Sequence, residues 1–309
     1  MDTGAFELFL EASVRLGAPL ALAALGEMVA ERAGVLNIGV EGCIIGGALG
    51  GALGALAAGD PWLGMLAGAG AGVFLSLLFA LFVVVLNGDQ IITGTAITLG
   101  GLGFSGVIYQ GVFGATGTAL TLPTLPALAI PGLSAIPLVG EAFFRQAPTV
   151  YLAGALALVL WWFLFRTERG LELRAVGEEP AAAEASGVRV QWTRFAAVVF
   201  GGALAGLAGA HLALAHAGTF TQGMSAGKGF IAIAVVVLGR WHPLGVLAAA
   251  LFFGAASAFQ FFLQALGVDM PYQVVLALPY ILTLAALAGW LGRARAPAWL
   301  ARPWPREGV

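Results

Sequence analysis

Long apolar runs alternate with short polar breaks along most of this chain. The breaks contain glycine, proline or charge, as in AGDPW (58–62), NGDQ (87–90) and GRWHP (239–243). An apolar run of roughly 18 or more residues can cross a bilayer as a helix. The pattern predicts spanning helices at about residues 5–28, 38–58, 62–86, 91–113, 149–166, 195–216, 223–239, 243–266 and 272–291. We therefore expect an all-α, polytopic membrane helix bundle with about 8–10 transmembrane helices.

The composition leaves no room for a large soluble domain. Hydrophobic residues make up 60% of the 309 residues and charged residues only 10%, and the mean hydropathy is +0.95. Soluble domains carry about 25% charge. Residues 1–309 are thus expected to form one transmembrane domain. The net charge of −2 gives no reason to expect nucleic acid as a partner, and Cys43, the only cysteine, excludes an intrachain disulfide.

The arginines predict which loops face the cytoplasm, because short cytoplasmic loops hold most of the Lys and Arg. Five arginines fall between residues 166 and 194, and four more follow in the tail, 292–309. We expect 167–194 to be a cytoplasmic loop and 292–309 a cytoplasmic basic tail. The loop 114–148 has one arginine and should be extracytoplasmic. Five spans before the arginine-rich loop would put the N-terminus outside.

Two similar stretches suggest an internal repeat. PWLGMLAGA (61–69) and PLGVLAAA (243–250) each follow a glycine-interrupted apolar segment, and the predicted topology runs those two segments in opposite directions. Paired glycine-broken segments in inverted halves are typical of transport sites inside the membrane. The alternative, a common helix start in a chain rich in Ala, Gly and Leu, remains open.

Glycines at every fourth position predict close helix packing. They form two series, one in each of two neighbouring predicted helices: Gly42, Gly46, Gly50 and Gly54, and Gly64, Gly68 and Gly72. Small residues at this spacing let neighbouring membrane helices approach closely.

The loop after residue 166 is an unusual polar island. Residues 166–194 hold five arginines and five glutamates, and an Ala-rich helical stretch starts at Pro180, a residue suited to the first helical position, and stops at Gly187. A short exposed helix of this kind is typical of a docking element for a soluble partner. A helix lying on the lipid headgroups is the alternative.

Three blocks of the sequence resemble one family of transport proteins. They are GEMVAERAGVLNIGVEGCIIGGALGG (26–51), LRAVGEEPAAAEASGVRV (173–190) and GMSAGKGFIAIAVVVLGRWHPLGVLAAALFFG (223–254). With the span pattern, they resemble the permease subunits of bacterial ABC importers of the branched-chain amino acid and simple-sugar class, most of all those of nucleoside importers. The resemblance covers most of the chain from Leu20 to Trp290.

That resemblance implies a non-catalytic subunit of an importer in the bacterial cytoplasmic (inner) membrane. Nucleosides are the expected substrate, with simple sugars and branched-chain amino acids as alternatives. The implied partners are an ABC ATPase subunit, an extracytoplasmic substrate-binding protein and a second permease, either a related chain or a second copy. No cofactor is expected on this chain; ATP and Mg would be bound by the ATPase. Consistently, GMSAGKG (223–229) has the Gly-Lys pair of a Walker A motif but lacks the Ser or Thr after the lysine and the correctly spaced first glycine.

The resemblance also assigns residues. In this family the second block is the coupling helix that seats in the ATPase, which implies coupling roles for Gly177, Glu178, Pro180, Ala182, Glu184 and Gly187. For the substrate pathway we expect uncharged hydrogen-bonding residues and one carboxylate near the glycine-broken segments: Asn37, Glu41, Thr93, Thr95, Thr98, Gln222 and Ser225. By contrast, Glu31 and Arg32 are expected to lie in water at the cytoplasmic end of the first span.

Two other classes of protein compete with this interpretation. A secondary transporter would account for an inverted repeat but leaves the charged loop unexplained. A rhomboid-type intramembrane serine protease would use Ser105 of GFSG (103–106) with His211 or His216. A metal site is not expected, because these two histidines are five residues apart and do not share a helix face.

Overall fold

The computed structural model describes residues 3–114, 121–134, 136–137, 139–265, 281 and 295–304 of the chain. Most of these residues are helical. The α-helices are α1 (Thr3–Arg32), α2 (Val40–Ala58), α3 (Pro61–Ala80), α4 (Gln90–Phe113), α5 (Gly140–Phe144), α6 (Pro148–Arg166), α7 (Glu168–Glu178), α8 (Pro180–Ala185), α9 (Val190–His211), α10 (Lys228–Leu238) and α11 (Pro243–Ala265). Two π-helical turns, η1 (Leu81–Val85) and η2 (Leu212–Ala217), extend α3 and α9, and the two-residue strands β1 (Leu128–Ala129) and β2 (Arg145–Gln146) pair antiparallel.

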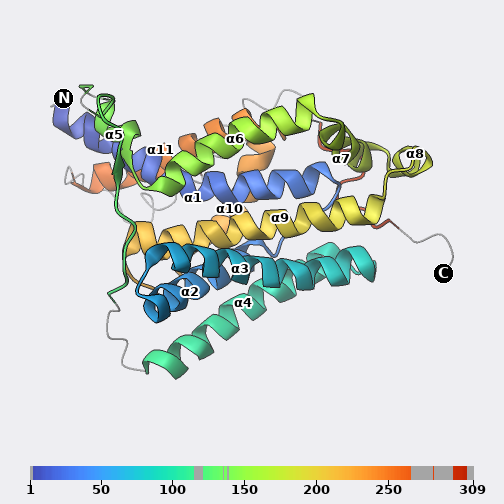
Figure 1. Cartoon of the computed structure of the whole chain (residues 1–309), viewed down its shortest axis with the longest axis horizontal. Helices are drawn as coiled ribbons and strands as arrows, with labels where there is room; N and C mark the ends of the chain where they lie inside the picture. Colours follow the sequence, from blue (N-terminus) through green and yellow to red (C-terminus); the bar gives the residue numbers. More distant parts are fainter. Residues whose placement is uncertain are drawn as a thin grey trace.

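The long helices lie side by side along one direction (Figure 1). α1 and α9 pack on each other, α11 and α6 pack on α1, and α2 and α3 pack on α9, with α4 outside them against α2. At one end of the bundle α7 and α8 project beyond the long helices, and at the other end lie α5 and the start of α1 (Figure 1). The predicted loops 114–148 and 167–194 therefore lie at opposite ends.

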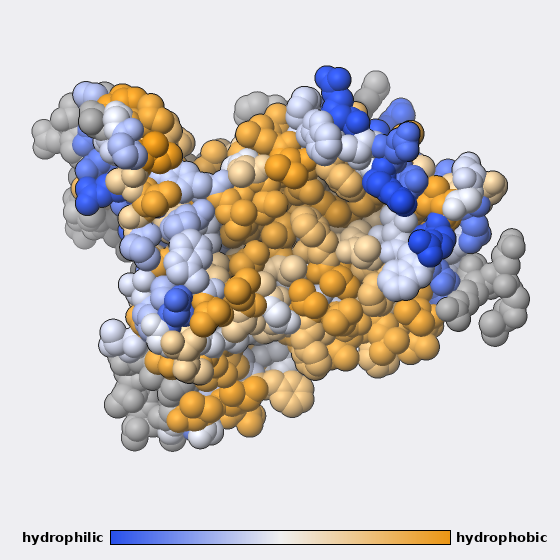
Figure 2. Space-filling view, viewed as in Figure 1, coloured by the Kyte–Doolittle hydropathy of each residue, from blue (hydrophilic) through white to orange (hydrophobic). Residues whose placement is uncertain are grey.

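The surface fits a membrane environment. Among the described residues, seven helices are long and apolar enough to span a bilayer, namely Phe6–Arg32, Val40–Ala58, Pro61–Val85, Gln90–Val112, Pro148–Arg166, Val190–Ala217 and Pro243–Gln260. Figure 2 shows apolar side chains across the middle of the molecule and hydrophilic ones gathered at its two ends. The prediction of an all-α, polytopic membrane bundle is confirmed, while the predicted span at 272–291 lies outside the described residues.

The predicted span at 223–239 is wrong. Residues 222–227 form turns, and the helix that follows, α10, has only 11 residues. A helix of that length covers roughly 16 Å, about half of the 30 Å hydrocarbon core. The stretch before α10, GMSAG (223–227), consists of small residues and one methionine without a charge, so the hydropathy pattern did not reveal that the helix starts only at Lys228.

The glycine series have the packing role expected of them. Gly46, Gly50 and Gly54 face side chains of α3, and Gly64, Gly68 and Gly72 are buried against α2 and α9. A Cβ at Gly72 would collide with the carbonyl oxygen of Gly202 on α9. These helices therefore pack backbone against backbone, at a separation that no larger side chain permits.

The two similar stretches both begin helices. Pro61 is the first residue of α3, where the Asp60 carboxylate caps the helix by accepting from Trp62 N at 2.6 Å. Pro243 likewise begins α11, which packs on α10 as α3 packs on α2. The polar breaks thus mark real helix starts, as their sequences predicted.

Candidate functional site

Three glutamates are buried where the end of α1 meets the starts of α2 and α10. Glu27 and Glu31 are each 1% exposed and Glu41 is 4% exposed. We call these three residues the carboxylate belt. Carboxylates are almost never buried without partners, so the groups around them show what the belt does.

Glu41 holds the start of α10 against the first turn of α2. One carboxylate oxygen accepts from Ser225 Oγ at 2.6 Å and from Gly227 N at 2.8 Å, and the other accepts from Gly229 N at 2.6 Å. The first amides of a helix have no partner within the helix, and they favour an anion. Glu41 therefore supplies, from another helix, the cap that α10 lacks in its own sequence.

Glu27 holds the extended connection between α1 and α2. Its Oε1 accepts from Asn37 N at 2.8 Å, and Asn37 Oδ1 in turn accepts from Gly39 N at 2.9 Å. Because Glu27 lies five residues before the end of α1, the chain has turned back by roughly 8 Å when it reaches Asn37. The second oxygen of Glu27 is buried without a hydrogen-bond partner among the described residues.

Glu31 lies in the protein interior, which overturns the expectation that it lies in water with Arg32. Its Oε2 accepts from the indole nitrogen of Trp241, and Arg32 Nε donates to the backbone oxygen of the same tryptophan at 2.8 Å. The turn after α10 folds over the end of α1 and removes Glu31 from solvent. Within the described part of the chain, Glu31 Oε1 has no hydrogen-bond partner.

α2 and α10 start at the same place and run in opposite directions. Both N-termini meet at Glu41, while the far end of α10 reaches Trp241 beside the end of α1. α2 instead leads to α3, whose Gly64 packs on Leu214 in η2, beyond the end of α9. Oppositely directed helices that begin inside a bundle are a common arrangement around the binding sites of transporters.

The remaining pathway candidates lie near α4. Thr98 is buried and donates to Ile38 O at 3.2 Å, whereas Thr95 is exposed and donates to Ile91 O within its own helix. Thr93 is half-buried. Gln222 is exposed, with its side-chain amide against Gly106 of α4. The structure thus separates the predicted set into buried residues, namely Asn37, Glu41, Thr98 and Ser225, and residues open to the surface, namely Thr95 and Gln222.

The residues of the protease alternative do not form a catalytic pair. Ser105 Oγ donates to Leu102 O of its own helix at 2.9 Å, and His211 Nδ1 lies in hydrogen-bonding contact with Thr149 Oγ1. In the part of the chain that the structure describes, no hydrogen bond joins Ser105 to a histidine. The same part holds no group of three or more His, Cys, Asp or Glu side chains placed to bind a metal ion.

The charged loop forms two short helices, where the sequence predicted one. Thr167 caps α7 by accepting from Gly170 N at 3.1 Å, and Pro180 is the first residue of α8, as expected. Gly187, at φ +86°, ends α8 through two backbone bonds, Gly187 N to Glu184 O and Val188 N to Ala183 O. We call α7 and α8 together the platform.

The expected coupling residues divide between the inside and the outside of the platform. Gly177 and Pro180 are buried, and Glu178, Ala182, Glu184 and Gly187 are exposed. A cavity of about 600 Å³ lies between α7 and α8, and Glu168, Glu172, Glu178 and Glu179 are among its lining residues. Small or apolar side chains, including Leu171, Ala175 and Val188, line it as well. The platform therefore presents a hollow that is lined by both acidic and apolar side chains.

Gly177 joins the platform to the helices that carry the carboxylate belt. It packs so closely under the end of α1 that a Cβ would collide with Arg32 O. The C-terminal segment 295–304 closes the same junction, because Trp299 N donates to Gly177 O at 2.9 Å and Ala301 N to Gly34 O at 3.2 Å. The predicted tail and the predicted cytoplasmic loop thus lie on one face of the molecule.

Sequence reasoning missed two residues of this junction. Arg194 is 3% exposed and donates to Ala33 O and Arg302 O, both at 3.1 Å. Trp241, which binds Glu31, belongs to a stretch that the sequence marks only as a polar break. A buried cation or indole cannot be recognised from sequence when its partners are backbone oxygens or a residue 210 positions away.

The sequence of the chain matches a known family of membrane proteins. Residues 9–287 match the family described as branched-chain amino acid transport system / permease component. The chain belongs to this permease family. It is similar over most of its length to permeases of ABC transporters, so it is a permease subunit of an ABC transporter.

Three characterised or named relatives illustrate the range of the family. The guanosine ABC transporter permease protein NupQ of Bacillus subtilis is 41% identical over 94% of each chain. The putative glucose ABC transporter permease protein TsgC13 of Haloferax volcanii is 40% identical over 90% of each chain. The nucleoside ABC transporter permease protein NupC of Lactococcus lactis is 35% identical, again over 90% of each chain.

Proposed function

We propose that this permease subunit forms the substrate pathway of an ATP-driven nucleoside importer in the bacterial inner membrane. A separate ABC ATPase would bind the platform, and a second permease subunit, related or identical, would complete the pathway. A substrate-binding protein would deliver nucleosides at the α5 end, and the platform and C-terminal tail would face the cytoplasm. Similarity to the guanosine and nucleoside permeases supports this substrate class.

The platform is the observation that carries the proposed coupling. The acidic and apolar side chains that line its cavity fit a partner surface that presents basic and apolar side chains. Its buried side is tied through Gly177 to the end of α1 and to the connection that leads to Asn37 and Glu41. A displacement of the platform would therefore move the shared start of α2 and α10, as rigid-body alternating access requires.

The surface of α4 is the part of this subunit best placed to line a pathway between two permeases. It carries Thr95, and Gln222 lies against it, so both offer hydrogen-bonding groups without a full charge. Such groups can bind a ribose hydroxyl or a base edge. No covalent chemistry is assigned to this chain; ATP and Mg would be bound by the ATPase.

The coupling role is tested by charge reversal on the platform. We expect Glu178→Arg and Glu184→Arg to abolish substrate-stimulated ATP hydrolysis by the purified complex while the permease still reaches the membrane. Glu178→Asp and Glu184→Asp are the matched controls, because each keeps the negative charge at its position and leaves the α5 end unchanged. Normal ATPase stimulation in both charge-reversal variants would refute the proposed docking site.

A glucose importer is the second candidate, favoured by the 40% identity to the glucose permease relative. Competition assays with radiolabelled guanosine in vesicles that contain the whole importer distinguish the two. Nucleosides should compete with guanosine uptake, and glucose should not. Uptake of glucose without uptake of any nucleoside would replace the proposed substrate but leave the coupling proposal intact.

A further inference from the structure

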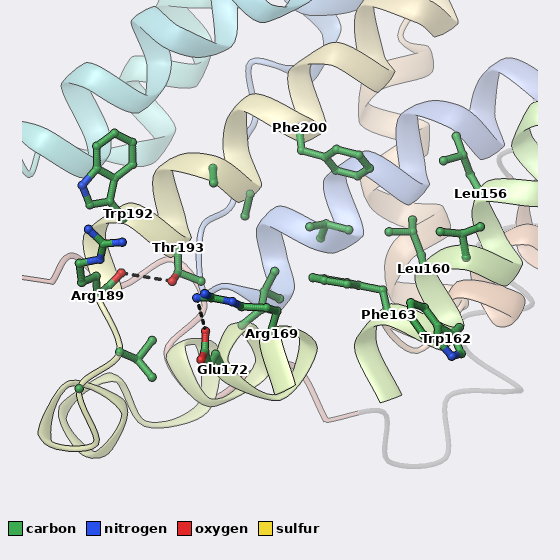
Figure 3. A pocket seen from close by; sticks show the side chains of 17 residues that line it. Leu156, Leu160, Trp162, Phe163, Arg169, Glu172, Arg189, Trp192, Thr193 and Phe200 are labelled. Atoms are coloured by element: carbon green, nitrogen blue, oxygen red, sulfur yellow. Dashed lines mark hydrogen bonds and ion pairs between the residues drawn. The ribbon is translucent and has the colours of Figure 1, made fainter. Parts of the chain in front are cut away.

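A groove opens between α6 and α9 at the platform end of the bundle (Figure 3). Its volume is about 620 Å³, within the range of small-molecule sites. α6 and α9 each pack on α1, and Val29 of α1 contributes to the lining between them. The first turns of α7 border the groove at its platform end, and we call this end the mouth of the groove (Figure 3).

The inner part of the groove is apolar. Leu156, Leu160 and Phe163 line it from α6, and Ala196 and Phe200 line it from α9 (Figure 3). These residues contribute no polar side-chain group for a polar ligand. An occupant of this part of the groove must therefore be a hydrocarbon chain or an apolar side chain.

Two tryptophans mark the level of the membrane surface. Trp162 on α6 is 58% exposed and Trp192 on α9 is 63% exposed, and both line the groove. Exposed tryptophans collect at the boundary between hydrocarbon and headgroups. The mouth of the groove therefore lies at headgroup depth.

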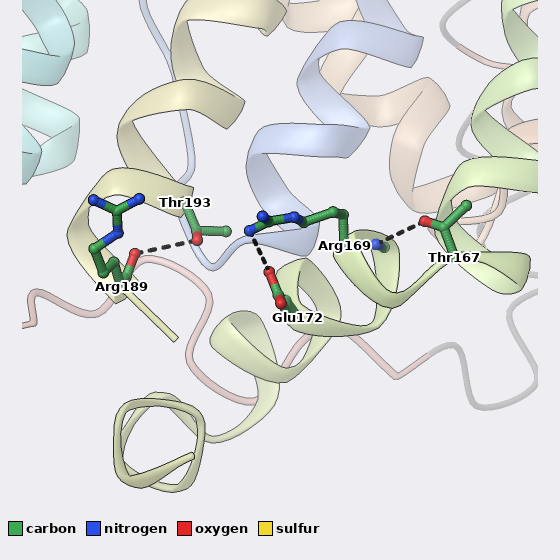
Figure 4. Close-up of polar contacts among 6 residues, drawn as sticks. Thr167, Arg169, Glu172, Arg189 and Thr193 are labelled. Atoms are coloured by element: carbon green, nitrogen blue, oxygen red, sulfur yellow. Dashed lines mark hydrogen bonds and ion pairs between the residues drawn. The ribbon is translucent and has the colours of Figure 1, made fainter. Parts of the chain in front are cut away.

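The mouth is polar and carries more positive than negative charge. Arg169 and Arg189 are exposed there, and Glu172 is the one acidic residue of the lining. Arg169 pairs with Glu172 at 3.2 Å, and the Arg189 backbone oxygen accepts from Thr193 Oγ1 (Figure 4). Among the described residues, the Arg189 guanidinium makes no hydrogen bond or ion pair, so it is available to an anion.

The depth of the groove fits within one leaflet. Leu156 lies six residues before Trp162 on α6, and Phe200 lies eight residues after Trp192 on α9, which corresponds to roughly 9 Å and 12 Å of helix. Half of the hydrocarbon core is about 15 Å. The apolar walls thus extend from the headgroup level through more than half of one leaflet.

We propose that this groove binds one anionic phospholipid of the leaflet on the platform side. Its phosphate would lie between Arg169 and Arg189, and one acyl chain would lie between α6 and α9. The charge at the mouth favours an anionic lipid over a neutral one, because an acyl chain alone gains nothing from the arginines. A transmembrane helix of another subunit could fill the apolar part but would leave Arg189 without an anion.

The test is lipid binding to the complete importer, measured by native mass spectrometry in a neutral detergent with added phosphatidylglycerol or phosphatidylcholine. We expect wild type to bind phosphatidylglycerol more tightly. The double variant Arg169→Gln/Arg189→Gln should bind it about 25-fold more weakly, about five-fold for each arginine removed. Arg166→Gln is the matched control, since Arg166 is exposed at the same level but does not line the groove.

A second variant tests the acyl-chain part. Ala196→Trp should fill the groove and weaken binding of both lipids, whereas Leu158→Trp, at an exposed position of α6 outside the groove, should have no effect. The proposal fails if wild type shows no preference for phosphatidylglycerol, or if Arg166→Gln loses it equally. It also fails if a photo-crosslinker at position 196 captures another subunit of the importer instead of lipid.

Discussion

Glu41 is the residue whose replacement best separates a structural role from a role in the substrate pathway. Glu41→Ala removes the acceptor for three donors on the chain that leads into α10, namely Ser225 Oγ, Gly227 N and Gly229 N. The serine hydroxyl can rotate to another acceptor, but the two backbone amides cannot.

The loss in the free energy of unfolding comes from those two amides and from the lost negative charge of Glu41. A buried donor left without an acceptor costs about 1–3 kcal/mol, and an anion at a helix N-terminus contributes about 0.3–2 kcal/mol. We therefore expect Glu41→Ala to destabilise the subunit by at least ~2 kcal/mol, which would lower the unfolding temperature by roughly 4 °C or more. Glu41→Gln should cost less, because its side-chain oxygen still accepts.

The assay is thermal unfolding of the purified complex in nanodiscs, combined with uptake in vesicles at matched protein levels. Thr95→Ala is the control for unfolding alone, because Thr95 is exposed and its hydroxyl bonds to Ile91 O in its own helix, so the free energy of unfolding should change by no more than about 0.5 kcal/mol. An unchanged unfolding temperature for Glu41→Ala would refute the capping argument. If Glu41→Ala kept the unfolding temperature but lost uptake, Glu41 would act in the substrate pathway, as its sequence position suggested.

Two further outcomes follow from the junction between α10 and α11. Trp241→Phe keeps an aromatic ring but leaves the buried Glu31 Oε2 without its donor, so we expect a loss of about 1–3 kcal/mol in the free energy of unfolding. The exposed Trp192→Phe should show no such loss. Burial, and to a lesser degree the nearby Arg32, lowers the pKa of His242 below its usual value. The unfolded chain therefore binds this proton first, so stability should fall as the pH drops below about 6.5. His242→Asn should show a smaller decrease in unfolding temperature between pH 7.5 and pH 5.5 than wild type; an equal decrease would assign the pH dependence to other groups.

Much of the architecture was readable because it depends on local sequence. Helix starts at Asp60-Pro61 and Pro180 need only a cap or a fixed backbone angle, and the stop at Gly187 needs only a residue that tolerates positive φ. The apolar runs predicted the long helices for the same reason, since spanning a bilayer is a property of one continuous segment. The platform residues could be assigned only through the resemblance to permeases, because nothing local shows what binds them.

The sequence alone determined that this is a helical membrane protein with a charged loop and a basic tail, because hydropathy and charge are sums over neighbouring residues. Only the tertiary structure decided that Glu31 is buried, that α10 begins inside the bundle, and that Glu41 caps it. These features depend on partners 184 to 210 positions apart, which only folding brings together. The sequence shows the same glutamate whether its carboxylate binds substrate or holds two helices together. Its hydrogen-bond partners, which only the structure shows, distinguish these two roles.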